Sequence, residues 1–201
     1  MKIIGIVDYG MGNLRSVSKA FEYLGYKTKI IQSKDEIKSI THLVLPGVGA
    51  FKDAIANLEK IKLKEEIIKF IESKKPFLGI CLGYQILFSI SEEFGLHKGF
   101  DILKGRVKKF PNLIKIPHMG WNKIYIISNS PIFKEIPDES YFYFNHSFYV
   151  DVEDKNIISS LTDYGVKFAS SISYENIFAV QFHPEKSQKL GLKLLNNFAK
   201  I

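Results

Sequence analysis

The sequence predicts an α/β fold with a mostly parallel central sheet, helices on both of its faces and antiparallel additions in the C-terminal half. In residues 2–90, short apolar runs alternate with segments of helical periodicity, as in strand–helix–strand crossovers. After about residue 95, strand-like runs follow one another with only turns between them, which indicates antiparallel neighbours. The sequence contains no repeat and no clear linker, so we expect a single domain over residues 1–201.

The N-terminal half alternates regularly between the two kinds of element. Leu14, Val17 and Phe21 recur three and four positions apart, which predicts a helix, and Gly25 follows as a C-cap. The expected elements of this half are strands at 2–7, 26–31, 41–47 and 75–80, and helices at about 14–24, 52–72 and 82–90.

The C-terminal half is rich in β-branched and aromatic residues, which favour strands. The expected strand regions are 105–110, 121–127, 140–152, 156–162, 166–172 and 176–182. A last helix is expected at about 188–200, where Leu192, Leu195 and Phe198 share one face.

Composition and charge narrow the class of protein. The net charge is +7, but most lysines stand among glutamates, as in residues 62–75, which is typical of a solvated helix face and argues against nucleic-acid binding. No apolar run reaches the roughly 18 residues of a membrane helix. The start of the chain has no secretory cleavage pattern, and the single cysteine excludes an internal disulfide. We expect a cytoplasmic enzyme that does not bind a membrane.

Cofactor and metal motifs are missing. Gly10-Met-Gly12 and Gly47-Val-Gly49 lack the third glycine of a dinucleotide fingerprint, and there is no Walker pattern. No histidine pair has metal-ligand spacing. We therefore expect neither a cofactor nor a metal.

Three loops follow apolar strands, at residues 8–13, 46–51 and 81–85, and in an open α/β sheet such loops meet at one edge. Cys81 stands in one of them, between Gly79 and Gly83. This spacing is the thiol version of the nucleophile elbow, a strained turn that needs small neighbours. The positive end of the helix predicted after Cys81 would favour a thiolate. The alternative is that Cys81 is a small buried hydrophobe.

A cysteine nucleophile needs a base, a group that orients the base, and donors for an oxyanion. His183 ends a predicted strand, and Glu185 follows two residues later, within reach of the imidazole ring. His118 and His146 are further histidines that could border the site. Residues 45–51 offer backbone N–H groups in a glycine turn. Each of these pieces alone could be a surface turn, so their combination carries the interpretation.

The segments Gly-Ile-Cys81-Leu-Gly-Tyr-Gln85 and Phe-His183-Pro-Glu185 together resemble the signatures of the class I (triad) glutamine amidotransferases. Other segments are similar to the glutaminase subunits of imidazole glycerol phosphate synthases, enzymes of histidine biosynthesis. These segments are residues 8–16, 45–51, 117–122, 141–150, 162–165 and 180–188. The resemblance covers about residues 3–199 and implies the flavodoxin-like fold of that family.

The resemblance also implies residue roles. Cys81 would attack the side-chain amide of glutamine, His183 would transfer the proton, and Glu185 would orient the imidazole. The other implied residues are Gly47, Val48 and Gly49 for the oxyanion, Gln85, Ser147 and Phe148 for the substrate, and Asn13, Met119, Trp121, Tyr143 and Lys186 for the partner interface. That partner would be a separate cyclase subunit with a (β/α)8-barrel fold, forming a heterodimer and receiving the ammonia.

Three residues differ from those usual in the family, namely Tyr84, Asp101 and Asn145. They leave open a paralogue that supplies ammonia to a sugar-amidating synthase. A further alternative is a non-catalytic flavodoxin-like binding module. The presence of Cys81, His183 and Glu185 argues against such a module.

Overall fold

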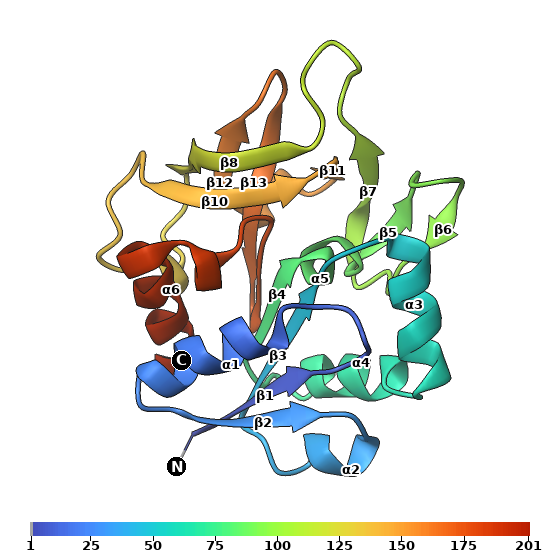
Figure 1. Cartoon of the computed structure of the whole chain (residues 1–201), viewed down its shortest axis with the longest axis vertical. Helices are drawn as coiled ribbons and strands as arrows, with labels where there is room; N and C mark the ends of the chain where they lie inside the picture. The colour runs from blue at the N-terminus through green and yellow to red at the C-terminus, as the bar shows by residue number, and fades with distance from the viewer. Residues whose placement is uncertain (1) are drawn as a thin grey trace.

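The computed structural model describes residues 2–201, and its main feature is a sheet with the strand order β2-β1-β3-β4-β14-β13-β12-β9 (Figure 1). Its strands are β1 (Ile3–Val7), β2 (Lys27–Ile31), β3 (His42–Gly47), β4 (Phe77–Cys81), β9 (Tyr125–Ile126), β12 (Ile158–Asp163), β13 (Lys167–Tyr174) and β14 (Ile177–Val180). Strands β2 to β14 in this order pair in parallel, and β13, β12 and β9 continue the sheet in antiparallel fashion. The predicted fold class is confirmed.

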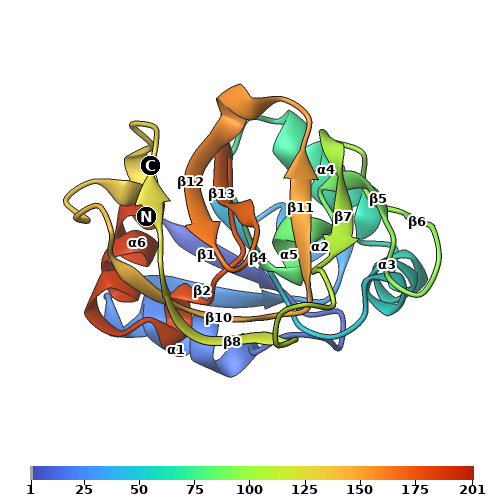
Figure 2. The ribbon, with the colours of Figure 1, turned by 90° about the horizontal axis from the view of Figure 1, so that it is seen from above.

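Two smaller sheets complete the C-terminal half. One consists of β8 (His118–Lys123) and β10 (Tyr141–His146), and Figure 2 shows these strands running side by side across the molecule. The other has the order β11-β7-β5-β6, with β5 (Phe88–Ser91), β6 (His97–Lys98), β7 (Leu103–Lys109) and β11 (Phe148–Val152). In Figure 1 the β8–β10 pair lies above the carboxyl ends of β3 and β4.

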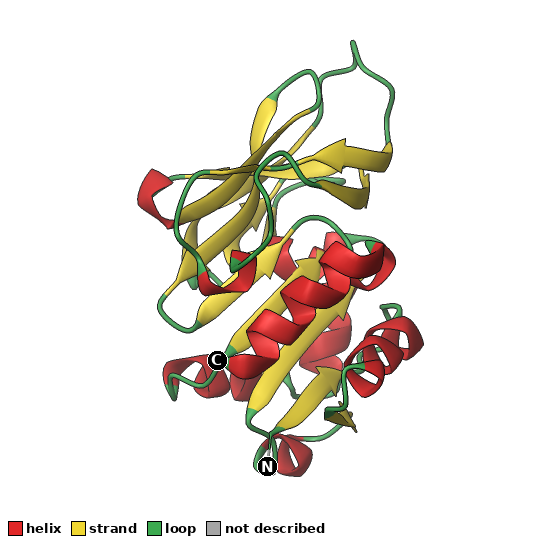
Figure 3. Ribbon diagram, turned by 90° about the vertical axis from the view of Figure 1, so that its left-hand side faces the viewer, coloured by secondary structure: helices red, strands yellow, loops and turns green. Residues whose placement is uncertain are grey.

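Helices cover both faces of the parallel part of the sheet, as Figure 3 shows. The α-helices are α1 (Leu14–Tyr23), α2 (Lys34–Ile37), α3 (Phe51–Lys60), α4 (Lys64–Glu72), α5 (Leu82–Gln85) and α6 (Gln188–Lys200), and the 3-10 helices are η1 (Pro131–Phe133), η2 (Lys155–Ile157) and η3 (Pro184–Lys186). Two buried clusters result. One contains Phe51 and Ile67 of α3 and α4, and the other contains Phe21 and Phe198 of α1 and α6. None of the helices over residues 2–201 has the length and apolar character that a bilayer crossing requires.

Two predicted helices differ from the structure. The helix expected at 52–72 is two helices, because Lys62 adopts a left-handed conformation (φ 57°) that ends α3 before α4 begins. The helix expected at 82–90 is wrong beyond its first turn: α5 ends at Gln85, and the chain enters β5. Phe88 pairs there with Leu103 of β7. Pairing with a neighbouring strand therefore determines the structure of this segment, although its local apolar pattern suits a helix.

Strands β3 and β4 are buried along their whole length, which explains their continuous apolar sequences. Their parallel register places Gly47 beside Cys81. On the other side of β4, Val180 of β14 pairs with Ile80, so the segment after β14 also begins beside the cysteine. Three separate parts of the sequence therefore meet at one edge of the sheet.

Candidate active site

Cys81 lies at a sharp turn between β4 and α5 and has φ 56° and ψ −106°. A side chain is rarely held in this left-handed region, so the turn is strained. The neighbouring glycines make it possible. A Cβ on Gly83 would lie 1.8 Å from the carbonyl oxygen of Leu45, and one on Gly79 would lie 2.7 Å from that of Gly83. The elbow thus requires glycine on both sides of the cysteine.

His183 and Glu185 follow β14 and are almost completely buried, with side-chain exposures of 2% and 1%. His183 Nδ1 lies 2.9 Å from Glu185 Oε1. A carboxylate can only accept, so Nδ1 carries the proton and the other ring nitrogen, Nε2, is free to accept one. Nε2 is buried and finds no hydrogen-bond partner among the described residues. The backbone N–H of His183 donates to the carbonyl oxygen of Tyr143 at 2.8 Å, which ties this segment to β10.

The electrostatic surroundings favour a charged imidazole. Burial by itself would lower the pKa of His183, but the attraction of a negative charge on Cys81 and the hydrogen bond with Glu185 together raise it. The geometry agrees with this direction, because β4 and β14 are neighbours in the sheet and the segments that carry Cys81 and His183 leave it side by side. A cysteine nucleophile requires a base on such a neighbouring segment.

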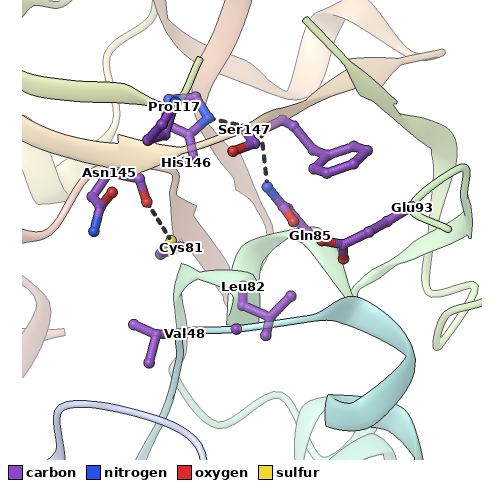
Figure 4. Close-up of a pocket in the computed structure, with 11 residues that line it drawn as sticks. Val48, Cys81, Leu82, Gln85, Glu93, Pro117, Asn145, His146 and Ser147 are labelled. Atoms are coloured by element: carbon purple, nitrogen blue, oxygen red, sulfur yellow. Dashed lines mark hydrogen bonds between the residues drawn. The ribbon is translucent and has the colours of Figure 1, made fainter.

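A cavity of about 260 Å³ opens at Cys81 (Figure 4). Its lining residues are Val48, Gly49, Cys81, Leu82, Gln85, Glu93, Pro117, Asn145, His146, Ser147 and Phe148. The Cys81 thiol lies 3.9 Å from the carbonyl oxygen of Asn145, and Gln85 Nε2 donates to the carbonyl oxygen of Phe148 at 3.0 Å. The cavity therefore lies between the elbow on one side and the β10–β11 turn on the other. No three His, Cys, Asp or Glu side chains of residues 2–201 gather as metal ligands do.

The glycine turn after β3 borders the same cavity. Val48 and Gly49 line it, whereas Gly47 lies behind them, where a Cβ would come within 2.3 Å of the Tyr9 hydroxyl. Gly49 has φ +103°, a conformation that favours glycine. Two of the three residues expected to form the oxyanion site thus face the cavity, and the third sets their position through close packing.

Sequence reasoning missed two polar residues of this region. Glu93 lines the cavity, accepts a hydrogen bond from the backbone N–H of Phe51 at 2.6 Å, and has its pKa raised by burial. Gln181 is fully buried beside Cys81. Glu93 stands in an acidic run that is typical of a solvated surface, so no local signal distinguished it. Gln181 could have been found, since it precedes His183 by two residues on the same edge.

The residues expected at a partner interface occupy the outer side of the site. Met119 and Trp121 of β8 are exposed, by 60% and 46%. The Trp121 ring meets the Tyr143 ring edge-on at 6.2 Å, and Lys186 Nζ lies 5.7 Å from the centre of the Tyr143 ring. Asn13 precedes α1, which packs against η3. Trp121, Tyr143 and Lys186 therefore form one surface next to His183. Met119 lies two residues before Trp121 in β8, and Asn13 lies on a neighbouring element.

Comparison with known proteins agrees with the fold. The family "Glutamine amidotransferase class-I" matches residues 5–201, and the chain belongs to this family. Solved structures of similar fold include PurLQS from Thermotoga maritima, with a TM-score of 0.79, 20% identity and coverage of 99% of this chain and 98% of that one. A glutamine amidotransferase from Thermotoga maritima has a TM-score of 0.66 and 19% identity, with coverage of 92% of this chain and 76% of that one.

Within the family, curated relatives are much more similar in sequence. The imidazole glycerol phosphate synthase subunit HisH of Desulfitobacterium hafniense is 51% identical, over 98% of this chain and 94% of the relative. The HisH subunit of Aquifex aeolicus is 51% identical over 96% and 94%, and that of Methanocaldococcus jannaschii is 49% identical over 99% and 100%. The resemblance inferred from the sequence motifs is confirmed.

Proposed function

We propose that Cys81, His183 and Glu185 hydrolyse the side-chain amide of glutamine to glutamate and ammonia. The chain is a glutamine amidotransferase, which defines the reaction class. The observation that supports the assignment of residues is the shared edge of the sheet. The strained Cys81 lines the cavity at the end of β4, and the buried pair of His183 and Glu185 follows β14, the strand next to β4. The combination supports the proposal, because Cys81 and the pair of His183 and Glu185 come from two parts of the sequence that lie 102 residues apart.

The geometry supports a two-step reaction. The Cys81 thiolate attacks the amide carbon, and the resulting oxyanion faces the backbone at Val48 and Gly49. The His183 imidazolium protonates the leaving nitrogen, and ammonia departs as the carbon–nitrogen bond breaks, leaving a thioester. His183 then takes a proton from water, whose oxygen attacks the thioester and releases glutamate. Glu185 holds the ring through Nδ1 during both steps.

The remaining polar groups of the cavity match the other end of glutamine. The carboxylate of Glu93 has a fixed position because the Phe51 N–H holds one of its oxygens, and it suits the α-ammonium group. Ser147 forms the turn between β10 and β11, Phe148 begins β11, and both line the cavity, where their backbone N–H groups would suit the α-carboxylate. Gln85 lies opposite this turn and is fixed by its hydrogen bond to Phe148. These contacts would select an amino acid rather than a simple amide.

The place of the reaction is histidine biosynthesis, as the HisH relatives at about 50% identity support. There the chain supplies ammonia to a cyclase subunit, and we propose that this partner is a (β/α)8 barrel that binds the surface of Met119, Trp121, Tyr143 and Lys186. Free ammonia would be protonated and lost to solvent. Glutamine hydrolysis should therefore be slow until the cyclase is bound and holds its own substrate.

The decisive experiment is covalent labelling of the full chain by a diazoketone analogue of glutamine, with the cyclase present. We expect one adduct at Cys81, and its loss in Cys81→Ala. The variant should also lower glutamate formation at least about a thousandfold, because nothing replaces the nucleophile. Synthesis from added ammonium salts by the same complex is the control, and it should continue.

The outcomes separate the candidate functions. An adduct elsewhere, or no adduct even with the cyclase present, would contradict the hydrolytic role and favour a non-catalytic binding module. The rate of glutamine hydrolysis, measured with and without the cyclase and its substrate, tests the role of the partner. Full activity of the isolated chain would argue against control by a cyclase.

A further inference from the structure

Gln181 has no role in the proposed reaction, yet its side chain lies between two groups that do. It directly follows β14, is fully buried, and does not line the cavity. Its Nε2 lies 3.7 Å from the Cys81 sulfur, within hydrogen-bonding range for that element. Its Oε1 accepts from Gln85 Nε2 at 3.0 Å. The amide thus connects the nucleophile to the residue that borders the substrate cavity.

The orientation of this amide follows from hydrogen-bond chemistry. The backbone carbonyl of Phe148 can only accept, so the group of Gln85 that faces it at 3.0 Å must be the NH2. The same NH2 also faces Gln181, which must therefore present its oxygen. Gln181 then has only its own NH2 left for the sulfur. The reverse orientation would set two NH2 groups against each other.

The Phe148 carbonyl also fixes the orientation of a second chain of hydrogen bonds, a branch that runs through His146, His118 and Asn122. His146 Nδ1 lies 2.7 Å from this carbonyl and therefore donates to it, so its Nε2 accepts from His118 Nδ1 at 2.9 Å. Asn122 Nδ2 in turn faces His118 Nε2 at 3.2 Å. Burial lowers the pKa of His146 to about 3 and that of His118 to about 4, which keeps both rings neutral. Every member of the branch has one consistent assignment, so the carbonyl is held firmly.

We propose that Gln181 is a further catalytic residue, whose NH2 group donates to the Cys81 sulfur and stabilises the thiolate. The inference rests on the proposed function only in taking Cys81 as the nucleophile. Charge-assisted hydrogen bonds are stronger than neutral ones, so the contact favours the thiolate over the thiol. The Asn145 carbonyl at 3.9 Å can accept only from the thiol form. Deprotonation therefore moves the sulfur's hydrogen bonding from Asn145 to Gln181.

This contact replaces a support that the sequence predicts and the structure does not provide. The helix expected after Cys81 is a single turn, α5, which is too short to supply a strong dipole. Two other titratable groups interact electrostatically with the sulfur, namely His183 and Tyr9. The Tyr9 hydroxyl is buried and has no hydrogen-bond partner among the described residues, and its pKa is raised by burial and by Cys81. A fixed neutral donor beside them stabilises the thiolate without adding a charge.

The test is the rate at which iodoacetamide alkylates the full-length chain as a function of pH. Cys81 is the only cysteine, so the rate reports on this thiol alone. Gln181→Met keeps the length of the side chain but removes the donor. We expect the alkylation rate at pH 7 to fall about tenfold and the midpoint of its profile to move up by about one pH unit. Gln181→Glu keeps the oxygen that faces Gln85 and sets a second oxygen against the sulfur, so its shift should be larger.

A matched control is Asn197→Leu. This variant removes another buried amide, which donates to the carbonyl oxygens of Ile132 and Lys134; none of these residues lines the cavity. It should change stability but leave the alkylation profile in place. With the cyclase and saturating substrate, Gln181→Met should lower kcat about tenfold while the KM for glutamine changes less than about twofold, because the residue does not line the cavity.

Superimposable alkylation profiles for the wild type and Gln181→Met would overturn the inference. Alkylation does not depend on glutamine, so this failure is distinct from a failure of wild-type hydrolysis. If neither Gln181 variant folds, the wild-type protein still decides. The side-chain amide proton signals of Gln181 in an NMR spectrum should move as Cys81 is deprotonated or alkylated, and signals that stay fixed would contradict the proposed contact.

Discussion

In the parallel region, β3 and β4 end side by side in turns where backbone approaches backbone, and a Cβ on Gly83 would lie 1.8 Å from the Leu45 carbonyl oxygen. In the antiparallel region, β8 and β10 contribute side chains: Trp121 is exposed, whereas His118 and His146 are buried next to the cavity. The parallel region thus positions the reacting atoms through main-chain geometry, and the antiparallel region covers them with side chains.

The difference teaches which changes each region tolerates. Close backbone contacts leave no room to adjust, so substitutions at the elbow should act on folding itself. Exposed side chains of β8 can be removed without disturbing the core, so substitutions there should act on partner binding. Hydrogen bonds join the two regions, and one of them is donated by the Tyr84 hydroxyl of α5 to the carbonyl oxygen of Ala169 in β13 at 3.2 Å. The following three predictions test this division.

The largest effect is expected for Gly83→Ala. The added methyl group would meet a strand backbone that cannot move without breaking the β3–β4 pairing, so the free energy of unfolding should fall by at least about 3 kcal/mol. Urea denaturation of the purified chain measures it. Gly25→Ala is the matched control, because Gly25 has φ +85° but no atom within 4 Å of a Cβ. It should lose only about 1–2 kcal/mol from backbone strain.

Equal losses in the two variants would contradict the division, because they would mean that strain at φ > 0 matters and close approach does not. A folded Gly83→Ala with unchanged activity would also show that the elbow adapts, and the requirement for glycine beside the cysteine would then need another explanation.

The elbow could be predicted from the sequence because its cause is local. Glycine on both sides of Cys81 has one clear physical reason, and the strands that carry it are continuous apolar runs. His183 and Glu185 could be found for a similar reason, since a polar group after a buried strand lies at the edge of the sheet.

Other features depend on contacts that the sequence does not state. Residues 82–90 have an apolar pattern that suits a helix, but Phe88 pairs with β7 instead. Glu93 lies in an acidic run and reaches the cavity only because the β5 strand ends beside α3. The orientation of Gln181 depends on the carbonyl of Phe148, which is 33 residues away. Tertiary pairing decides each of these cases.

A smaller effect, restricted to assembly, is expected for Trp121→Ala. The ring is 46% exposed on β8 and packs against Tyr143, so its loss should not destabilise the core. Aromatic anchors often dominate an interface, so the affinity for the cyclase should fall about 10–100-fold. Titration calorimetry with the purified cyclase measures it. Phe94→Ala, which removes an 88% exposed ring from the loop between β5 and β6, is the control and should bind normally.

The smallest effect is a dependence of stability on pH that arises from a buried histidine of the parallel region. His42 in β3 is 3% exposed, and burial lowers its pKa to about 4, below the value of about 6.5 in an unfolded chain. Between these values the unfolded chain binds a proton that the folded chain does not. Stability must therefore fall as the pH falls, by at most about 1.4 kcal/mol per pH unit from this group.

His42→Leu removes the proton-binding group that causes this loss of stability. The free energy of unfolding of the variant should therefore rise relative to that of the wild type as the pH is lowered from 7 to 4.5. Urea denaturation at a series of pH values gives the difference. Leu43→Val, a change at the next residue of β3, is the control: it should lower stability by a similar amount at every pH. If the difference between His42→Leu and the wild type does not depend on pH, then His42 is hydrated or charged in the folded chain. The parallel region would then be less tightly closed than its backbone contacts indicate, and the contrast with the antiparallel region would weaken.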